Sequence, residues 1–129
     1  MELKCAETTG PLIDLFFSVH RTLGFGFLEC IYSKAMMIAG KRTGLDIRSE
    51  VPINVYFESS MIGQFKADLI VNNSVVVELK ACRAIAPEHE AQLLNYLKAP
   101  NYEVGFLFNF GPTARCKRIV FDNVRKGQR

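Results

Sequence analysis

The sequence predicts one domain of the α+β class, in the order helix, helix, three strands, helix and two strands. The chain has 129 residues, which is enough for one hydrophobic core but too few for two comfortable ones. Near the start, apolar residues recur every three or four positions, which is typical of helices. Further along, apolar blocks are separated by the turn-forming sequences ESS and NNS, which indicates consecutive strands.

Two helices are expected at the start of the chain. Pro11 suits a first helical position, and the helical spacing runs from there to about Leu23. The sequence GFG at residues 24–26 interrupts this spacing. Helical spacing resumes over residues 27–42, and Gly44 is expected to end the second helix.

The rest of the chain predicts a mixed sheet with one further helix. Pro52 cannot donate a hydrogen bond to a strand ladder, so the first strand is expected at a sheet edge or with a bulge. Helical spacing returns between Pro87 and Pro100. The expected strands lie near residues 46–57, 61–71, 74–81, 103–111 and 115–122.

The composition is that of a folded soluble protein. Hydrophobic residues make up 49% of the chain and charged residues 22%, without a low-complexity tract, so one domain over residues 1–129 is expected, with its core at about 11–122. No apolar run approaches the ~20 residues of a membrane-spanning helix, and the N-terminal sequence lacks a secretion signal. A cytoplasmic protein without a membrane partner is expected. The four cysteines form no CxxC or CxxH pair, which argues against a zinc or iron–sulfur site built from local motifs and favours reduced thiols.

The net charge of +3 is mild, but basic residues gather near the C-terminus. They could contact the phosphates of a nucleic acid, or they could form a solvated basic end that includes the short tail at residues 123–129. The basic residues in this part of the chain are Arg115, Lys117, Arg118, Arg125, Lys126 and Arg129.

Charged residues interrupt two apolar strands. Because side chains alternate between the faces of a strand, Glu78 and Lys80 share one face in the sequence VVVELK. In the preceding strand, alternation places Asp68 with Lys66 and Ile70, opposite an apolar set. That set is Phe65, Ala67, Leu69 and Val71.

A hairpin at the NNS turn would bring Asp68 close to Glu78. Two close carboxylates repel unless one is protonated or a cation lies between them, and Mg²⁺ takes oxygen ligands of this kind. Lys80 could then hold a water molecule or contact a phosphate. The alternative is a hairpin whose charged side chains simply face solvent.

Two further pairs of polar residues lie at helical spacing. Gln92 and Tyr96 are four residues apart on one helical face. Glu29 lies in the first turn of its helix, three residues before Tyr32. Each pair also has a structural explanation, because Glu29 would complement the helix dipole and the other pair would mark an amphipathic boundary.

Taken in order, these residues resemble a known family. The pattern Gly26-x-x-Glu29-x-x-Tyr32, Asp68, Glu78-x-Lys80 and Gln92-x-x-x-Tyr96 is similar to that of the GxxExxY family, a branch of the PD-(D/E)XK nuclease superfamily whose members carry a QxxxY helix. The similarity extends over about Leu12 to Phe121. Ala67 stands where the superfamily has its naming proline, which contributes no ligand.

The resemblance implies a restriction-endonuclease-like core, in which helices flank a mixed sheet in the order ααβββαββ. By similarity, Asp68 and Glu78 would bind Mg²⁺ or Mn²⁺ with the Leu79 carbonyl, and Glu29 would reach the metal directly or through water. Lys80 would orient or help to deprotonate the attacking water. Gln92 and Tyr96 would position this lysine and the scissile phosphate.

The expected function is therefore metal-dependent hydrolysis of phosphodiester bonds in nucleic acid, with DNA as the expected substrate. Neither histidine is needed, although His89 lies one helical turn before Gln92 and could line the site. One alternative is a module of the same fold that binds nucleic acid or a protein without turnover. Another is a purely structural charged cluster. A homo-oligomer and a protein partner both stay open.

Overall fold

The structure is a computed structural model that describes residues 6–98 and 102–122. It has the predicted order of elements, and the α+β class with a mixed five-stranded sheet is confirmed. The elements are α1 (Ala6–Leu23), α2 (Glu29–Thr43), β1 (Ile47–Phe57), β2 (Ser60–Val71), β3 (Val75–Lys80), α3 (Pro87–Tyr96), β4 (Val104–Phe110) and β5 (Ala114–Val120).

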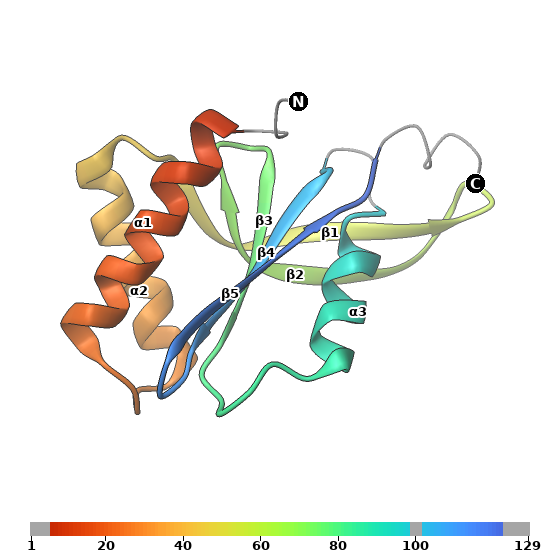
Figure 1. Ribbon diagram of the computed structural model, residues 1–129. Helices are drawn as coiled ribbons and strands as arrows, with labels where there is room; N and C mark the ends of the chain where they lie inside the picture. The colour runs from red at the N-terminus through yellow and green to blue at the C-terminus, as the bar shows by residue number, and fades with distance from the viewer. Residues whose placement is uncertain (1–5, 99–101, 123–129) are drawn as a thin grey trace.

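The sheet has the strand order β1-β2-β3-β4-β5. The pair β3 and β4 is parallel and connected through α3, while the other neighbours are antiparallel. Figure 1 shows α1 and α2 on one face of the sheet and α3 on the other. Strand β1 lies at an edge, as Pro52 predicts. Neither α1, α2 nor α3, the helices of the described part of the chain, has the length and apolar character needed to span a membrane.

The tight turns follow from local sequence. Glu58 and Ser59 join β1 to β2 with positive φ angles, and Asn72 and Asn73 lie at φ values of 51° and 55° between β2 and β3. Positive φ at both central residues gives a turn whose twist matches antiparallel strands, and asparagine tolerates this conformation better than most residues. The NNS sequence therefore forms the expected hairpin.

Helix α1 begins earlier than the sequence predicts. It starts at Ala6, so that Pro11 lies inside the helix and not at its first position. The side chain of Asn72 donates a hydrogen bond to the Thr8 hydroxyl at 3.1 Å, and Thr8 is buried. This tertiary contact holds the additional turn, whose first N–H groups have no partner within the helix.

Two apolar clusters lie on opposite faces of the sheet. The larger one packs α1 and α2 on the sheet, and its centre is aromatic: Phe16 stacks on Phe108 with a ring distance of 4.4 Å, and Tyr32 stacks on Phe110 at 4.2 Å. Buried aromatic rings contribute large apolar areas and prefer such offset contacts. The smaller cluster packs α3 through Leu93 and Leu97.

The predicted alternation along β2 is wrong around Asp68. Phe65 and Ala67 pack with the α3 cluster, whereas Leu69 and Val71 pack with the cluster under α1 and α2. Ile70 in turn lies on the same side as Ala67, not opposite to it. The strand changes faces because it leaves the regular ladder at Asp68, where the pairing with β3 stops. Strict alternation holds only along a regular strand.

The backbone beyond β3 is held by a buried amide. The Asn109 side chain, 1% exposed, accepts a hydrogen bond from the Cys82 N–H at 3.0 Å and donates one to the Cys82 carbonyl at 2.9 Å. A side chain at Gly111 would meet the same carbonyl, since a Cβ atom there would lie 2.4 Å from the oxygen. The segment after Lys80 is therefore firmly positioned.

We expect Asn109→Ala to destabilise the fold by about 2–4 kcal/mol, because it leaves the N–H and the carbonyl of the half-buried Cys82 without partners. Chemical denaturation measures this loss. Asn54→Ala is the matched control, because Asn54 is exposed and its side chain accepts from Gln64 and donates to the Tyr56 hydroxyl at the surface. The control should stay within about 0.5 kcal/mol of the wild type. Equal stability of both variants would contradict a role for Asn109 in holding this segment.

Candidate metal-dependent active site

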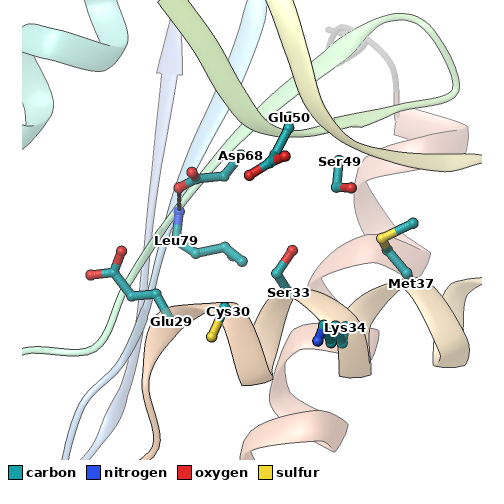
Figure 2. Close-up of a pocket in the computed structure, with 9 residues that line it drawn as sticks. All are labelled: Glu29, Cys30, Ser33, Lys34, Met37, Ser49, Glu50, Asp68 and Leu79. Atoms are coloured by element: carbon teal, nitrogen blue, oxygen red, sulfur yellow. Dashed lines mark hydrogen bonds between the residues drawn. The ribbon is translucent and has the colours of Figure 1, made fainter.

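A cleft of about 380 Å³ opens between α2 and the strands β1 to β3. Figure 2 shows the side chains that line it. The lining residues are Glu29, Cys30, Ser33, Lys34, Met37, Ser49, Glu50, Asp68 and Leu79. Two of the predicted site carboxylates, at Glu29 and Asp68, therefore share this cleft with Leu79.

The centre of the site is the place where β2 and β3 separate. Their backbone pairing ends at Leu69 and Val77, and the next pair in register would be Asp68 and Glu78. Side chains replace the missing backbone bonds: the Leu79 N–H donates to Asp68 Oδ2 at 2.8 Å, and the Asp68 N–H donates to Glu78 Oε1 at 3.2 Å. Since buried backbone N–H groups need acceptors, the two carboxylates complete the ladder across the gap.

Burial and charge act together on Glu78. The side chain is buried, and its desolvation, together with the nearby Asp68 carboxylate, raises its pKa from 4.5 to about 8. The hydrogen bond from the Asp68 N–H and the charge of Lys80 act in the opposite direction. The pair therefore holds a proton near neutral pH, and a divalent cation could take the place of that proton.

The donors in this gap fit a hard divalent cation. Asp68 and Glu78 each accept a backbone N–H through one oxygen, and the two side chains also hydrogen-bond to each other, a contact that a cation could replace. Oxygen donors of this type suit Mg²⁺ and Mn²⁺. Within residues 6–98 and 102–122, no three His, Cys, Asp or Glu side chains are already gathered as a metal site.

Lys80 follows Glu78 on the same strand and is half-buried. Its charge is close enough to lower the pKa of Glu78. In the parallel pairing of β3 with β4, it lies opposite Asn109, the residue that anchors Cys82. Glu78 and Lys80 thus lie at the end of β3, and the backbone that follows this strand is held by Asn109.

Helix α3 brings the second predicted pair to the same gap. The Tyr96 hydroxyl interacts with Glu78 and Asp68, and burial followed by these two negative charges raises the Tyr96 pKa. Gln92 hydrogen-bonds to Tyr96 and acts in the opposite direction. The Tyr96 ring stacks on Phe65 with a ring distance of 3.6 Å and an angle of 15°. The helix is thereby fixed over the β2 side of the gap.

The three residues of the GxxExxY pattern form one local structure. Gly26 has a φ of 123°, which a residue with a side chain rarely adopts, and it lies in the loop between α1 and α2. The buried Tyr32 hydroxyl donates to the Gly24 carbonyl at 2.5 Å and accepts from the Phe27 N–H at 3.3 Å. The loop is thereby fastened in front of Glu29, the first residue of α2.

Other predicted residues lie outside the cleft. Arg115, Lys117 and Arg118 are on β5, at the sheet edge opposite β1. Alternation directs the first two to the α3 face and the third to the α1 face. Lys117 forms an ion pair with Glu90 at 3.5 Å. The structure thus does not gather the three into one basic patch, and the tail at 123–129 lies outside the described residues.

The two histidines have structural contacts. His89 Nδ1 accepts a hydrogen bond from the Ala86 N–H at 3.1 Å at the start of α3. His20 Nε2 lies 2.8 Å from the Gly111 carbonyl oxygen, to which it donates. His89 is therefore a helix-capping residue and does not line the cleft.

Sequence reasoning missed several residues of the cleft, among them Ser33, Ser49 and Glu50. Glu50 belongs to a strand whose alternation also breaks, and it has a positive φ of 52°. The only signal in the sequence is an acidic residue shortly before Pro52, which is too common a combination to indicate a site.

We expect Glu78 to lower the stability of the metal-free protein as the pH rises. Below about pH 4.5 the carboxyl group is protonated in both states; between that value and about 8, only the folded state keeps the proton. Stability is therefore lost across this window. In thermal melts with a chelator, the wild-type melting temperature should fall by roughly 5 °C or more relative to Glu78→Gln between about pH 5 and about pH 8.

The control for this measurement is Glu88→Gln, which changes an exposed glutamate of α3. It should keep the wild-type dependence on pH. Parallel curves for the wild type and Glu78→Gln would contradict the raised pKa.

Comparison with known proteins agrees with this geometry. A family model described as the PD-(D/E)XK nuclease superfamily matches residues 6–119, which includes α1, α2, α3 and nearly all of the sheet. The comparisons found no match among curated proteins and none among solved structures. The match extends over most of the chain and contains the separated strands, both carboxylates and the α3 pair. The chain belongs to the PD-(D/E)XK nuclease superfamily.

Proposed function

We propose that the protein is a nuclease of the GxxExxY type that hydrolyses phosphodiester bonds in nucleic acid with the help of Mg²⁺ or Mn²⁺, and that DNA is its substrate. The observation that carries the proposal is the pair Asp68 and Glu78, whose carboxylates span the gap between β2 and β3. Superfamily membership supports it. Lys80, Gln92 and Tyr96 surround the same gap from β3 and α3.

The residues divide into a cation-binding group and a substrate-binding group. Asp68 and Glu78 would hold the cation with the Leu79 carbonyl, and Glu29 would approach from α2. When bound, the cation would activate a water molecule and neutralise charge on the phosphate. These ligands are negatively charged and therefore suit the cation. The phosphate is also negative, so its hydrogen-bond donors must be positively charged or neutral groups.

Lys80 and Tyr96 are the donors best suited to the phosphate. The ammonium group of Lys80 can donate hydrogen bonds to the attacking water and to a phosphate oxygen. Because its pKa is raised, the Tyr96 hydroxyl stays protonated and can donate as well. Gln92 would orient that hydroxyl through the hydrogen bond between the two side chains. Such preorganised donors stabilise the charge that develops in the transition state.

A binding module with the same fold is the alternative, and a substitution of Lys80 distinguishes the module from a nuclease. We expect Lys80→Ala to lose about 10²-fold or more in cleavage rate, the scale of a positioned acid–base group, because the lysine would act on the reacting water. Its affinity for the substrate should stay within a few-fold of the wild type. Cleavage and binding are measured on single- and double-stranded DNA and RNA, with Mg²⁺ and with Mn²⁺.

Lys66→Ala is the matched control for this experiment. Lys66 is exposed on β2 and does not line the cleft, so the variant should cleave like the wild type. If the wild type cleaves no substrate above the Lys80→Ala background but binds one tightly, the binding module replaces the nuclease.

The α3 pair gives a second prediction. Tyr96→Phe should reduce cleavage by about 10-fold or more, because it removes the hydroxyl while leaving an aromatic ring to stack on Phe65. Gln92→Ala should also reduce cleavage, by freeing the hydroxyl from its partner. Both variants should melt within about 2 °C of the wild type, since neither removes a buried apolar group.

Asn95→Ala, an exposed substitution on the same helix, controls for changes in α3 itself and should retain full activity. A fall in melting temperature that accounts for the loss of activity would instead assign Gln92 and Tyr96 a structural role.

A further inference from the structure

We propose that Glu50 is an additional cation-binding residue of this site, an inference that rests on the proposed nuclease function. Glu50 lies on β1 and lines the same cleft as Glu29, Asp68 and Leu79. Figure 2 shows its carboxylate directed toward Asp68 from the neighbouring strand. The resemblance to the GxxExxY pattern does not include this residue.

The pairing of β1 with β2 places Glu50 at the level of Asp68. The pairs on either side are Ser49 with Leu69 and Val51 with Ala67, and the pair between them is absent from the ladder. One step further across the sheet, pairing between β2 and β3 is also absent at Asp68 and Glu78. The three acidic residues thus lie at adjacent irregular positions on three neighbouring strands.

The irregularity in β1 changes the face of the strand, as it does in β2. Ile47 packs with the cluster under α1 and α2, whereas Val51 and Ile53 pack with the α3 cluster, although even spacing would put all three on one face. The change takes place at Glu50, whose φ of 52° is unusual for a residue with a side chain. This backbone conformation directs the Glu50 side chain toward the cleft and not toward the face that regular alternation would give it.

The Glu50 carboxylate is not used in the packing of the protein. It is exposed, and in the described ranges no hydrogen bond or ion pair involves it. Two ion pairs near the sheet, Arg48 with Asp46 and Lys117 with Glu90, lie outside the cleft. Its charge is therefore available to a ligand.

The charge balance indicates what that ligand is. Glu29, Glu50 and Asp68 line the cleft together with one lysine, Lys34. An excess of negative charge would repel a nucleic acid phosphate, since like charges at short range cost free energy, especially where water is excluded. Glu50 is compatible with a phosphodiester substrate when its charge contributes to binding a divalent cation beside Asp68. Carboxylates around a metal typically change its affinity by about 10- to 100-fold.

The test is Mn²⁺ binding by calorimetric titration of the full chain, with the melting temperature as a check on folding. Glu50→Gln should weaken Mn²⁺ binding by about 10-fold, because it removes the charge and keeps the shape of the side chain. Glu50→Gly, which accepts the positive φ without strain, should show the same loss and melt no lower than the wild type. Together the two variants separate the carboxylate from the backbone conformation.

Glu58→Gln is the matched control. Glu58 is also an exposed glutamate with positive φ, 48°, but it lies in the turn after β1 and does not line the cleft. This variant should bind Mn²⁺ within about two-fold of the wild type, the spread expected for a residue remote from the ion. Equal affinity of the wild type, Glu50→Gln and Glu58→Gln would overturn the proposal.

Cleavage assays on the same proteins distinguish this inference from the proposed function. If Glu50→Gln weakens Mn²⁺ binding but the wild type does not cleave nucleic acid, the cation site stands and the nuclease activity fails. If the wild type cleaves and its affinity for Mn²⁺ does not depend on Glu50, the nuclease activity stands and this inference fails. Absence of Mn²⁺ binding by the wild type at millimolar concentration would overturn both.

Discussion

The separation of β2 from β3 is the feature on which the rest of the site depends. Two antiparallel strands that diverge leave backbone N–H groups without acceptors, and here the carboxylates of Asp68 and Glu78 accept them. The same two side chains that complete the ladder are the ones that a cation would bind. A structural requirement, satisfaction of buried N–H groups, thus holds two acidic groups closer together than their charges alone would allow.

Helices on both faces of the sheet bring side chains to this gap. The helices α1 and α2 cover one face of the sheet and α3 covers the other, so the separated strands can be approached from both sides (Figure 1). Glu29 reaches the gap from α2, and Tyr96 reaches it from α3. In a regular sheet, the side chains of α2 and those of α3 would be separated by the full thickness of the sheet. The opening at Asp68 is what allows residues from both layers to act on the same charges.

The charged groups at the gap shift the pKa values of one another. Burial and the Asp68 charge raise the pKa of Glu78 to about 8, and the same two carboxylates help to raise the pKa of Tyr96. The titrations of Glu78 and Tyr96 are therefore coupled, and a charge placed between the carboxylates would change both. Perturbed groups gathered beside a cleft are typical of functional sites, and here the residues that perturb one another are also those that the sequence pattern singles out.

The sequence by itself determined the order of the elements, the two turns and the proximity of Asp68 to Glu78, because helical spacing, turn residues and polar interruptions of apolar strands are local signals. Tertiary structure alone decided the change of face at Asp68 and the place of Glu50, which arise where neighbouring strands separate. It also decided the early start of α1, through the contact between Thr8 and Asn72. A pattern read along one strand contains no information on whether its neighbours stay paired, and in this fold that pairing decides which side chains meet.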